Sequence, residues 1–241
     1  MRLDIVIPAH NEEHRIDRML TAYRAGCPHP GTRFHVALDH CTDGTAEIVR
    51  GHQRADRRIE LHEYPKLGKG GVIAETFRRS DADLVGFVDA DGATPPAELL
   101  RLADVAGRAD GAIASRHHPA SVLPASRPLS RRLTSAGFAF GVRRLLGLPY
   151  RDTQCGAKVL RGDVARDIVA HTTSQDLLFD VDLLVTARDL GHRVVEVPTV
   201  WVDQEGSRVD PVADTRRMGA SLLRLWAASL RRRVREVAGA A

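Results

Sequence analysis

Two aspartates, Asp89 and Asp91, stand at the end of a strongly apolar run over residues 84–88 and are separated by a single alanine. Such a run is typical of a buried strand, and the glycine and prolines within 92–96 end it. Side chains two residues apart in an extended chain point to the same side, so both carboxylates can hold one hard cation. Because such a cation keeps positions open for phosphate oxygens, the pair predicts a metal–diphosphate site. A surface turn is the alternative, but two carboxylates at the end of a buried strand need a partner.

Three further polar segments follow expected strands. The first is 8–13, where Asn11 as the cap of a helix is the simpler interpretation for that segment alone. The second is 39–45. In the third, 66–71, the glycines allow a close approach of the backbone to a ligand, and Lys69 can meet a phosphate, although no Walker motif is present. Each segment alone is typical of a turn, but these three and the 89–91 segment on one edge of a sheet together predict a ligand-binding site.

The elements that must position these segments alternate along the first 115 residues. Strands are expected at 3–8, 34–38, 59–63, 84–88 and 111–114, and helices at 12–24, 45–55, 70–79 and 96–106. This alternation predicts βαβ units, and therefore an α/β fold with a mainly parallel sheet and helices on both faces. Later we expect a surface loop at 117–128, helices at 129–146 and 179–190, a strand at 193–202, a polar segment at 203–211 and a last helix at 214–237.

Composition narrows the class of protein. The chain has 241 residues and is 43% hydrophobic, which suits one large α/β domain. It has no apolar stretch near the ~20 residues that span a bilayer, and its first residues lack the core of a secretory signal. Cys27, Cys41 and Cys155 form no CxxC pair. We therefore expect free thiols in a reducing cytoplasm, and the cysteines do not support a zinc site.

Positive charge is concentrated near the C-terminus. The net charge is +4, and residues 216–235 hold seven arginines and no acidic residue. Subtracting those seven charges leaves −3 for the rest of the chain, which argues against a protein that binds nucleic acid. We therefore divide the chain into a domain over 1–213 and a basic amphipathic helix over 214–241.

On a helical wheel this last helix separates charged from apolar side chains. The arginines on one face are Arg217, Arg224, Arg231 and Arg235, and the apolar residues opposite are Leu222, Leu223, Trp226, Leu230, Val234 and Val237. The pattern is typical of a helix that lies on an anionic membrane surface. A terminal helix that packs its apolar face on the domain is the alternative, and a lipid substrate would favour the membrane.

In order and spacing, segments 8–13, 39–45, 68–71 and 89–91 resemble the family 2 glycosyltransferases with the GT-A fold. Three later segments, 114–116, 152–158 and 206–209, are similar to the dolichyl- or polyprenyl-phosphate glucosyltransferases and the related polyprenyl-phosphate mannosyltransferases. The resemblance covers about residues 3–210. The run Asp-Thr-Gln-Cys-Gly at 152–156 is its most specific part.

The resemblance implies roles for individual residues. The residues that would bind the nucleotide sugar are Pro8, Ala9, Glu12, Asp39, Lys69, Asp89 and Ala90. Arg208 could close over the diphosphate, with a solvated loop arginine as the alternative. Asp89 and Asp91 would hold Mg²⁺ or Mn²⁺ on the donor diphosphate, and Asp91 thereby also serves catalysis. Asp180, at a helix start, would be the catalytic carboxylate, with a dipole-stabilising cap as the alternative. Relatives usually carry paired aspartates where this chain has Leu38 and Asp39, which leaves the choice between uridine and guanosine open.

The chemical group on the acceptor that attacks the sugar determines whether the enzyme needs a general base. A lipid phosphate is already largely ionised near pH 7 and needs positive charge to hold it, whereas a hydroxyl group needs a general base. The candidate acceptor-binding residues are Arg116, Arg127, Arg131, Arg132 and Gln154. We expect an inverting, metal-dependent transfer of a hexose, with glucose from UDP-glucose as the expected donor, to a polyprenyl phosphate. The enzyme would act in the cytoplasm or peripherally at the cytoplasmic membrane.

Three alternatives remain at this point. The same fold could glycosylate a soluble hydroxyl acceptor, such as a secondary metabolite. A sugar-phosphate nucleotidyltransferase would open with a GGxGxR loop after its first strand, where this chain has 8–13 instead. A non-enzymatic protein that binds nucleotide sugars is less expected, because both metal carboxylates are present.

Overall fold

The computed structural model describes residues 1–123, 129–176, 178–202 and 222–230, with only the backbone for 129–136 and 138. Within these residues a seven-stranded sheet has the order β3-β2-β1-β4-β6-β5-β7. The strands are β1 Leu3–Ala9, β2 Thr32–Asp39, β3 Ile59–Tyr64, β4 Leu84–Val88, β5 Gly111–Ser115, β6 Ala157–Arg161 and β7 Val194–Pro198. Strand β6 is antiparallel to β4 and β5, and the other pairs are parallel. The predicted mainly parallel sheet is confirmed.

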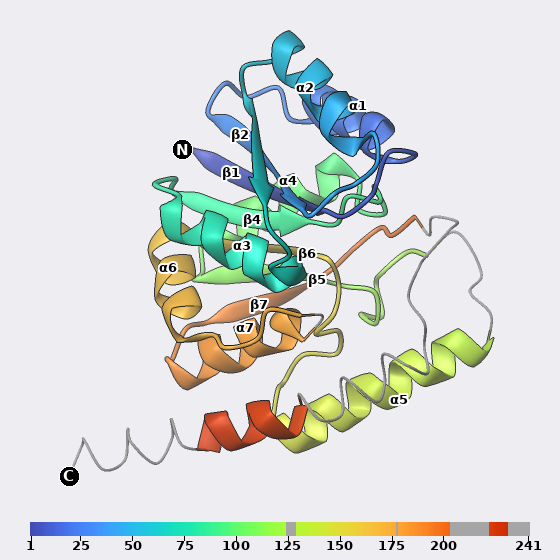
Figure 1. The fold of residues 1–241 in the computed structure, drawn as a ribbon. Helices are drawn as coiled ribbons and strands as arrows, with labels where there is room; N and C mark the ends of the chain where they lie inside the picture. Colours follow the sequence, from blue (N-terminus) through green and yellow to red (C-terminus); the bar gives the residue numbers. More distant parts are fainter. Residues whose placement is uncertain (124–128, 177, 203–221, 231–241) are drawn as a thin grey trace.

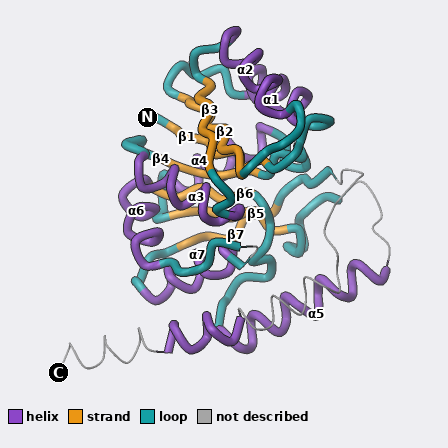
Figure 2. Tube along the Cα trace, viewed as in Figure 1, coloured by secondary structure: helices purple, strands orange, loops and turns teal. Residues whose placement is uncertain are grey.

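Helices cover both faces of the sheet, as predicted (Figure 1, Figure 2). They are α1 Ile16–Gly26, α2 Thr45–Ala55, α3 Gly68–Arg79, α4 Pro96–Ala106, α5 Leu129–Leu146, α6 Gly162–His171 and α7 Phe179–Asp189. One apolar core joins the sheet to α1, α2 and α4, and a second joins the opposite face to α3, α6 and α7. Strands β1, β2, β4 and β5 are buried almost throughout because both faces are covered.

Two expectations about individual elements need correction. Helix α1 begins at Ile16 instead of residue 12, because Asn11 has a φ of 56°, in the left-handed region, which ends the extended chain and delays the helix. Strand β6 and helix α6 were not expected. Strand β6 is only five residues long, and its lysine interrupts the apolar pattern that marks the other central strands.

The later segments agree with expectation where the structure describes them. Helix α5 has the expected bounds, and β7 is shorter than expected because the chain after Pro198 forms only a single bridge, between Val122 and Val200. Residues 222–230 are helical, while 203–221 and 231–241 lie outside the described residues, so the division at residue 213 stays a prediction. Among the helices described, none has the length and apolarity needed to cross a membrane.

A buried carboxylate ties the opposite, amino-terminal end of the sheet together. Asp4 on β1 is fully buried and accepts hydrogen bonds from Arg33 Nε at 2.8 Å and from Ser80 Oγ at 2.6 Å. Burial alone would raise the pKa of Asp4, but contacts with His35, Arg33 and Ser80 outweigh it and lower the pKa from 3.8 to about 2. The ionised form therefore stabilises the folded state.

We expect Asp4→Asn to lower the free energy of unfolding at pH 7 by about 2 kcal/mol. The stabilisation by Asp4 is fully present above the unfolded-state pKa near 3.8 and is lost as the pH falls towards 2. The difference between wild type and variant should therefore narrow below pH 4. Urea unfolding in metal-free buffer at several pH values measures it, and a difference that is the same at pH 7 and pH 3 would contradict this account.

Candidate active site

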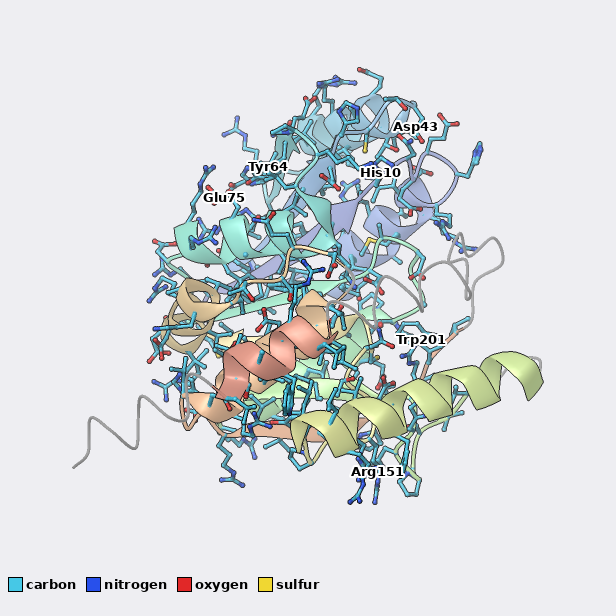
Figure 3. The ribbon with its side chains drawn as sticks, turned by 60° about the horizontal axis from the view of Figure 1, so that its bottom comes forward. His10, Asp43, Tyr64, Glu75, Arg151 and Trp201 are labelled. Atoms are coloured by element: carbon cyan, nitrogen blue, oxygen red, sulfur yellow. The ribbon has the colours of Figure 1, made fainter. Side chains whose placement is uncertain are left out.

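The loops that carry the predicted site residues meet at one edge of the sheet. Strands β2, β1 and β4 are neighbours and run parallel, so their carboxyl ends lie side by side. Figure 3 shows His10 and Asp43, from the loops after β1 and β2, at the same end of the molecule. The sheet edge predicted to bind a ligand is therefore assembled by the parallel order of three strands.

The first two loops are joined by hydrogen bonds between them. The side-chain Oδ1 of Asn11 accepts a hydrogen bond from Thr42 N at 2.8 Å, and Glu12 N donates to Thr45 Oγ1 at 2.8 Å. Asn11 therefore bridges two loops and does not cap the following helix, which corrects the simpler interpretation of that segment. The carboxylate of Glu12 accepts two hydrogen bonds from Arg15, at 2.7 and 2.8 Å. Glu12 is thus held near the sheet edge, where the sequence places it.

Asp39, at the end of β2, organises the glycine-rich loop. Its Oδ1 accepts a hydrogen bond from Leu67 N at 2.6 Å, and its Oδ2 accepts one from Gly68 N at 3.1 Å. His10 Nδ1 donates to the backbone oxygen of Asp39 at 2.6 Å. The structure thus places Asp39 between the β1 loop and the start of α3, where its role in binding the nucleoside stays a prediction.

The glycine-rich loop lies against the segment before α7. Gly70 N and Gly71 N donate to Gln175 O at 3.0 and 3.3 Å. A Cβ on Gly70 would lie 2.3 Å from the Cβ of Phe179, so only glycine allows this approach. This close packing brings Lys69 to the first turn of α7.

Lys69 lies between two of the predicted carboxylates. Its Nζ is 2.8 Å from Asp89 Oδ1 and 3.1 Å from Asp180 Oδ2. The other oxygen of Asp180 is 2.5 Å from Nζ of Lys158, a buried lysine on β6 that also donates to Cys155 O at 2.8 Å. The structure therefore joins Asp89, Lys69, Asp180 and Lys158 in an alternating charge chain.

The electrostatics of this charge chain favour its ionised form. Burial by itself would raise the pKa of Asp180, but Lys158 and Lys69 outweigh burial, and the pKa lies below its usual value. Burial would lower the pKa of Lys69, yet Asp180 and Asp89 raise it well above the ordinary range. Asp180 is consequently a weak base in this arrangement.

Asp91 has the opposite electrostatic environment. Burial and the nearby charge of Asp89 raise its pKa, although its Oδ1 accepts a hydrogen bond from Ala93 N at 2.9 Å. A carboxylate that is buried beside another carboxylate gains from a cation bound between them. The donor set of Asp89 and Asp91 therefore fits a hard divalent ion, as the sequence predicts.

Gly156 explains part of the 152–156 motif. Asp89 N donates to Gly156 O at 3.1 Å, and a Cβ on Gly156 would lie 1.8 Å from Asp89 Oδ2. The carboxylate of Asp89 can occupy its place only because residue 156 has no side chain. Gln154, predicted for the acceptor, is half-buried in the same turn, and its N donates to Asp152 Oδ1 at 3.1 Å.

Arg116 is already engaged in a buried ion pair. Its Nε and Nη2 donate to the two carboxylate oxygens of Asp152 at 2.7 and 3.0 Å, and its guanidinium stacks over the Trp201 ring at 5.1 Å. Burial opposes the charges, but the pair raises the pKa of Arg116 and lowers that of Asp152. This pair connects the end of β5 with the 152–156 motif, so binding of an acceptor by Arg116 stays a prediction.

The structure describes only some of the remaining predicted site residues. Pro8 and Ala9 end β1, and Ala90 is buried between the two aspartates. Arg131 and Arg132 lie in α5, where only the backbone is described. Arg127 and Arg208 lie outside the described residues.

Two residues of the site had no assigned role in the sequence. Lys158 could have been noticed as a lysine inside an apolar strand, because such a charge needs a buried partner. Asp152 lies in a motif that the resemblance quotes, but its partner is 36 residues away. Asp182, two residues after Asp180 in α7, lies outside the charge chain: its carboxylate accepts hydrogen bonds from Thr173 N and Ser174 N, both at 2.8 Å.

Solved structures with a similar fold are glycosyltransferases of the GT-A fold. Glucosyl-3-phosphoglycerate synthase from Mycobacterium tuberculosis, in complex with Mn²⁺, UDP and glucosyl-3-phosphoglycerate, matches with a TM-score of 0.68, covering 96% of this chain and 79% of that chain at 16% identity. Mannosyl-3-phosphoglycerate synthase from Rubrobacter xylanophilus matches with a TM-score of 0.62, covering 98% and 75%, at 17% identity. At such identities the likeness establishes the fold, and the predicted GT-A fold is confirmed.

The sequence relatives identify the family. The family model described as glycosyl transferase family 2 matches residues 4–169, and the chain belongs to that family. The dolichyl-phosphate beta-glucosyltransferase of Drosophila melanogaster is 30% identical, covering 94% of this chain and 74% of the relative. The undecaprenyl-phosphate mannosyltransferase of Micrococcus luteus is 31% identical, covering 85% of both chains. Glycosyltransferase AglD of Haloferax volcanii is 31% identical over 94% of this chain, which spans 37% of the length of AglD.

We expect Gly156→Ala to weaken divalent-ion binding about 10- to 100-fold, the range for residues that orient metal ligands. The new methyl group would displace the Asp89 carboxylate from a position 1.8 Å away. Electron paramagnetic resonance of Mn²⁺, with UDP or GDP present, measures the affinity. Gly141→Ala is the matched control, because a Cβ there meets nothing within 4 Å. Equal Mn²⁺ affinity in Gly156→Ala and Gly141→Ala would contradict the assignment.

Proposed function

We propose that this family 2 glycosyltransferase moves a hexose from a nucleoside-diphosphate sugar to a polyprenyl phosphate and inverts the anomeric centre. The observation that carries the proposal is the alternating charge chain beside Asp91, which places two carboxylates and two ammonium groups at the ligand edge of the sheet. The names of relatives, a dolichyl-phosphate glucosyltransferase and an undecaprenyl-phosphate mannosyltransferase, support the acceptor class.

Asp89 and Asp91 are the residues that would hold the donor's divalent ion, Mg²⁺ or Mn²⁺. Such an ion supplies positive charge to the leaving diphosphate. The M. tuberculosis synthase with the same fold was solved with Mn²⁺ and UDP, which supports this assignment. Lys69, 2.8 Å from Asp89, adds a second positive charge at the same place. UDP-glucose is the donor that we propose. Because this chain has only Asp39 where relatives usually have two aspartates, the choice between uridine and guanosine stays open, and GDP-mannose is the donor to compare.

The weak basicity of Asp180 favours a phosphate acceptor over a hydroxyl group. A hydroxyl acceptor must lose a proton to a base, whereas a phosphate oxygen near pH 7 is already largely ionised. Two lysines lower the pKa of Asp180 and occupy both of its oxygens. In the proposed reaction an acceptor phosphate oxygen forms a bond to the anomeric carbon as the bond to the diphosphate breaks. Asp180 then acts by holding Lys69 and Lys158 in position.

Arginines on the acceptor side would hold the lipid phosphate. We retain the predicted acceptor-binding role for Arg131 and Arg132, at the start of α5, and for Arg127 and Gln154. Arg116 shares its charge with Asp152, so its contribution would be to fix the turn that carries Gln154. Arg208 would close over the diphosphate.

The helix over 222–230 is the proposed contact with an anionic membrane. It is attached to the domain by Leu225, which is buried, and by Ser229, whose Oγ donates to Asp189 Oδ2 at 2.8 Å. Leu223, Trp226 and Leu230 are 61, 40 and 41% exposed. Spaced by three and four residues, these side chains lie on one helix face, and such an exposed apolar stripe is typical of a helix at a membrane interface.

The reaction is tested by the release of nucleoside diphosphate from UDP-glucose and, separately, from GDP-mannose. We expect release only when Mg²⁺ or Mn²⁺ and a short polyprenyl phosphate are both present. Donor binding without lipid-dependent release from any sugar nucleotide would overturn the lipid acceptor and point to soluble hydroxyl compounds.

Asp180→Asn separates the two acceptor classes. The change removes the carboxylate that Lys69 and Lys158 share, so kcat is expressed per folded enzyme. With a phosphate acceptor we expect this kcat to fall by less than about 100-fold, the lower end of what the loss of a general base costs, with the shape of the pH–rate profile retained. Loss of the acidic limb of that profile would instead show that Asp180 is a base. Asp182→Asn is the matched control, because Asp182 is a second buried aspartate in the first turn of the same helix, α7.

The membrane contact is tested by sedimentation with vesicles of phosphatidylglycerol. We expect Leu223→Ser combined with Trp226→Ser to reduce binding at least about tenfold, because two apolar side chains of the exposed stripe are lost. Val122→Ser, which removes an exposed apolar residue elsewhere, is the control. Equal binding of the double variant and the control would exclude this face as the contact.

A further inference from the structure

Three potential metal ligands gather on the edge strands, away from the proposed active site. His35 lies on β2, and Glu60 and His62 lie on the edge strand β3. In the parallel register His35 is beside Glu60, and Ala37 is beside His62. Residues that alternate along neighbouring strands share one face of the sheet, so the three side chains meet on that face. Tyr64, labelled in Figure 3, stacks on His62 and marks the place.

The distances between the ligand atoms suit a tetrahedral ion. His35 Nδ1 is 3.1 Å from His62 Nε2 and 3.5 Å from Glu60 Oε2, and His62 Nε2 is 3.8 Å from the same oxygen. An ion about 2.0–2.1 Å from each ligand in tetrahedral geometry has its ligands about 3.3 Å apart. The three atoms therefore already stand near the corners of such a site.

A buried carboxylate supports the metal-binding orientation of His35. The His35 side chain is buried, and its other ring nitrogen, Nε2, is 3.2 Å from Asp4 Oδ2. Asp4 is itself held by Arg33 and Ser80. Nε2 makes no hydrogen bond to the residues that the structure describes, but the negative charge of Asp4 close to it favours the tautomer with hydrogen on Nε2, and so leaves the lone pair of the other ring nitrogen for a metal ion. Here that lone pair is on Nδ1, which faces His62 and Glu60.

We propose that His35, Glu60 and His62 bind one divalent transition-metal ion, with zinc as the best match. Two imidazole nitrogens and one carboxylate oxygen are ligands that zinc prefers, whereas Mg²⁺ prefers oxygen alone. Glu60 and His62 are 42 and 28% exposed on their side chains, so solvent reaches the site and water can complete the coordination. The absence of a cysteine motif hides this site from sequence reasoning.

The site is distinct from the donor's cation site. His35 precedes Asp39 by four residues of β2, which places it roughly 13 Å from the carboxyl end of the strand. Its ligands connect β2 with β3, the edge strand of the sheet. The bound ion therefore fastens β3 to the sheet, and an edge strand needs such protection because one of its sides lacks a partner strand.

Cobalt(II) titration of the full chain, free of affinity tags and with excess Mg²⁺ present, tests the proposal. Tetrahedral Co²⁺ with nitrogen ligands absorbs strongly in the visible range, whereas an octahedral site of oxygen ligands absorbs weakly. We expect one equivalent of Co²⁺ to give the tetrahedral band and Zn²⁺ to displace it. His62→Ala should abolish the band. Glu60→Gln is a nearly isosteric change at a partly exposed residue, and it should weaken Co²⁺ binding at least about tenfold.

Two controls make the outcome specific. Asp91→Asn should keep the band, because it alters only the donor's cation site. His171→Ala should also keep it, because that histidine pairs with Asp167 on α6. In thermal unfolding, Zn²⁺ should raise the Tm of the wild type, raise that of Glu60→Gln less, and leave that of His62→Ala unchanged. A missing band, or a band that survives both His62→Ala and Glu60→Gln, would show that His35 and His62 form a metal-free hydrogen bond and would overturn the proposal.

Discussion

The alternating charge chain at the carboxyl edge of the sheet is the interaction on which the rest of the site depends. Asp89, Lys69, Asp180 and Lys158 follow one another at 2.8, 3.1 and 2.5 Å. The removal of such groups from water costs several kcal/mol for each ion, and only close pairing offsets that penalty. The loss of one member leaves its neighbours as uncompensated charges. The fold must therefore bring all four together at once.

Each member of the charge chain comes from a different element, and close packing of the backbone makes the meeting possible. Gly70 allows the loop of Lys69 to lie on Phe179, and Gly156 allows the 152–156 turn to lie on Asp89. Strand β6 is paired antiparallel with β4, and this register sets Lys158 opposite Phe87. The Phe87 ring lies near both lysine ammonium groups, 5.5 Å from one and 5.3 Å from the other. Apolar packing and charge pairing thus reinforce the same geometry.

Strand β2 links the site to the edge of the sheet. Its last residue, Asp39, holds the start of the glycine-rich loop through two backbone N–H groups, and it is in register with Tyr64 on β3. His35, earlier on the same strand, faces Glu60 and His62 of β3. An edge strand that shifted by one residue would turn every side chain to the other face. Contacts that hold β3 in register therefore also support the loop that carries Lys69.

The sequence by itself determined the alternation of strands and helices, the Asp-x-Asp pair at the end of β4 and the bounds of α5, because these follow from local periodicity and turn residues. The family resemblance named Asp180, but local periodicity could not distinguish it from Asp182, since side chains two residues apart on a helix point about 200° apart and only packing selects the one that faces the site. Likewise, the direction of β6 and the partner of Lys158 were decided only by the tertiary structure. A five-residue strand does not encode its neighbour, because pairing and register depend on contacts between residues that are distant in the chain.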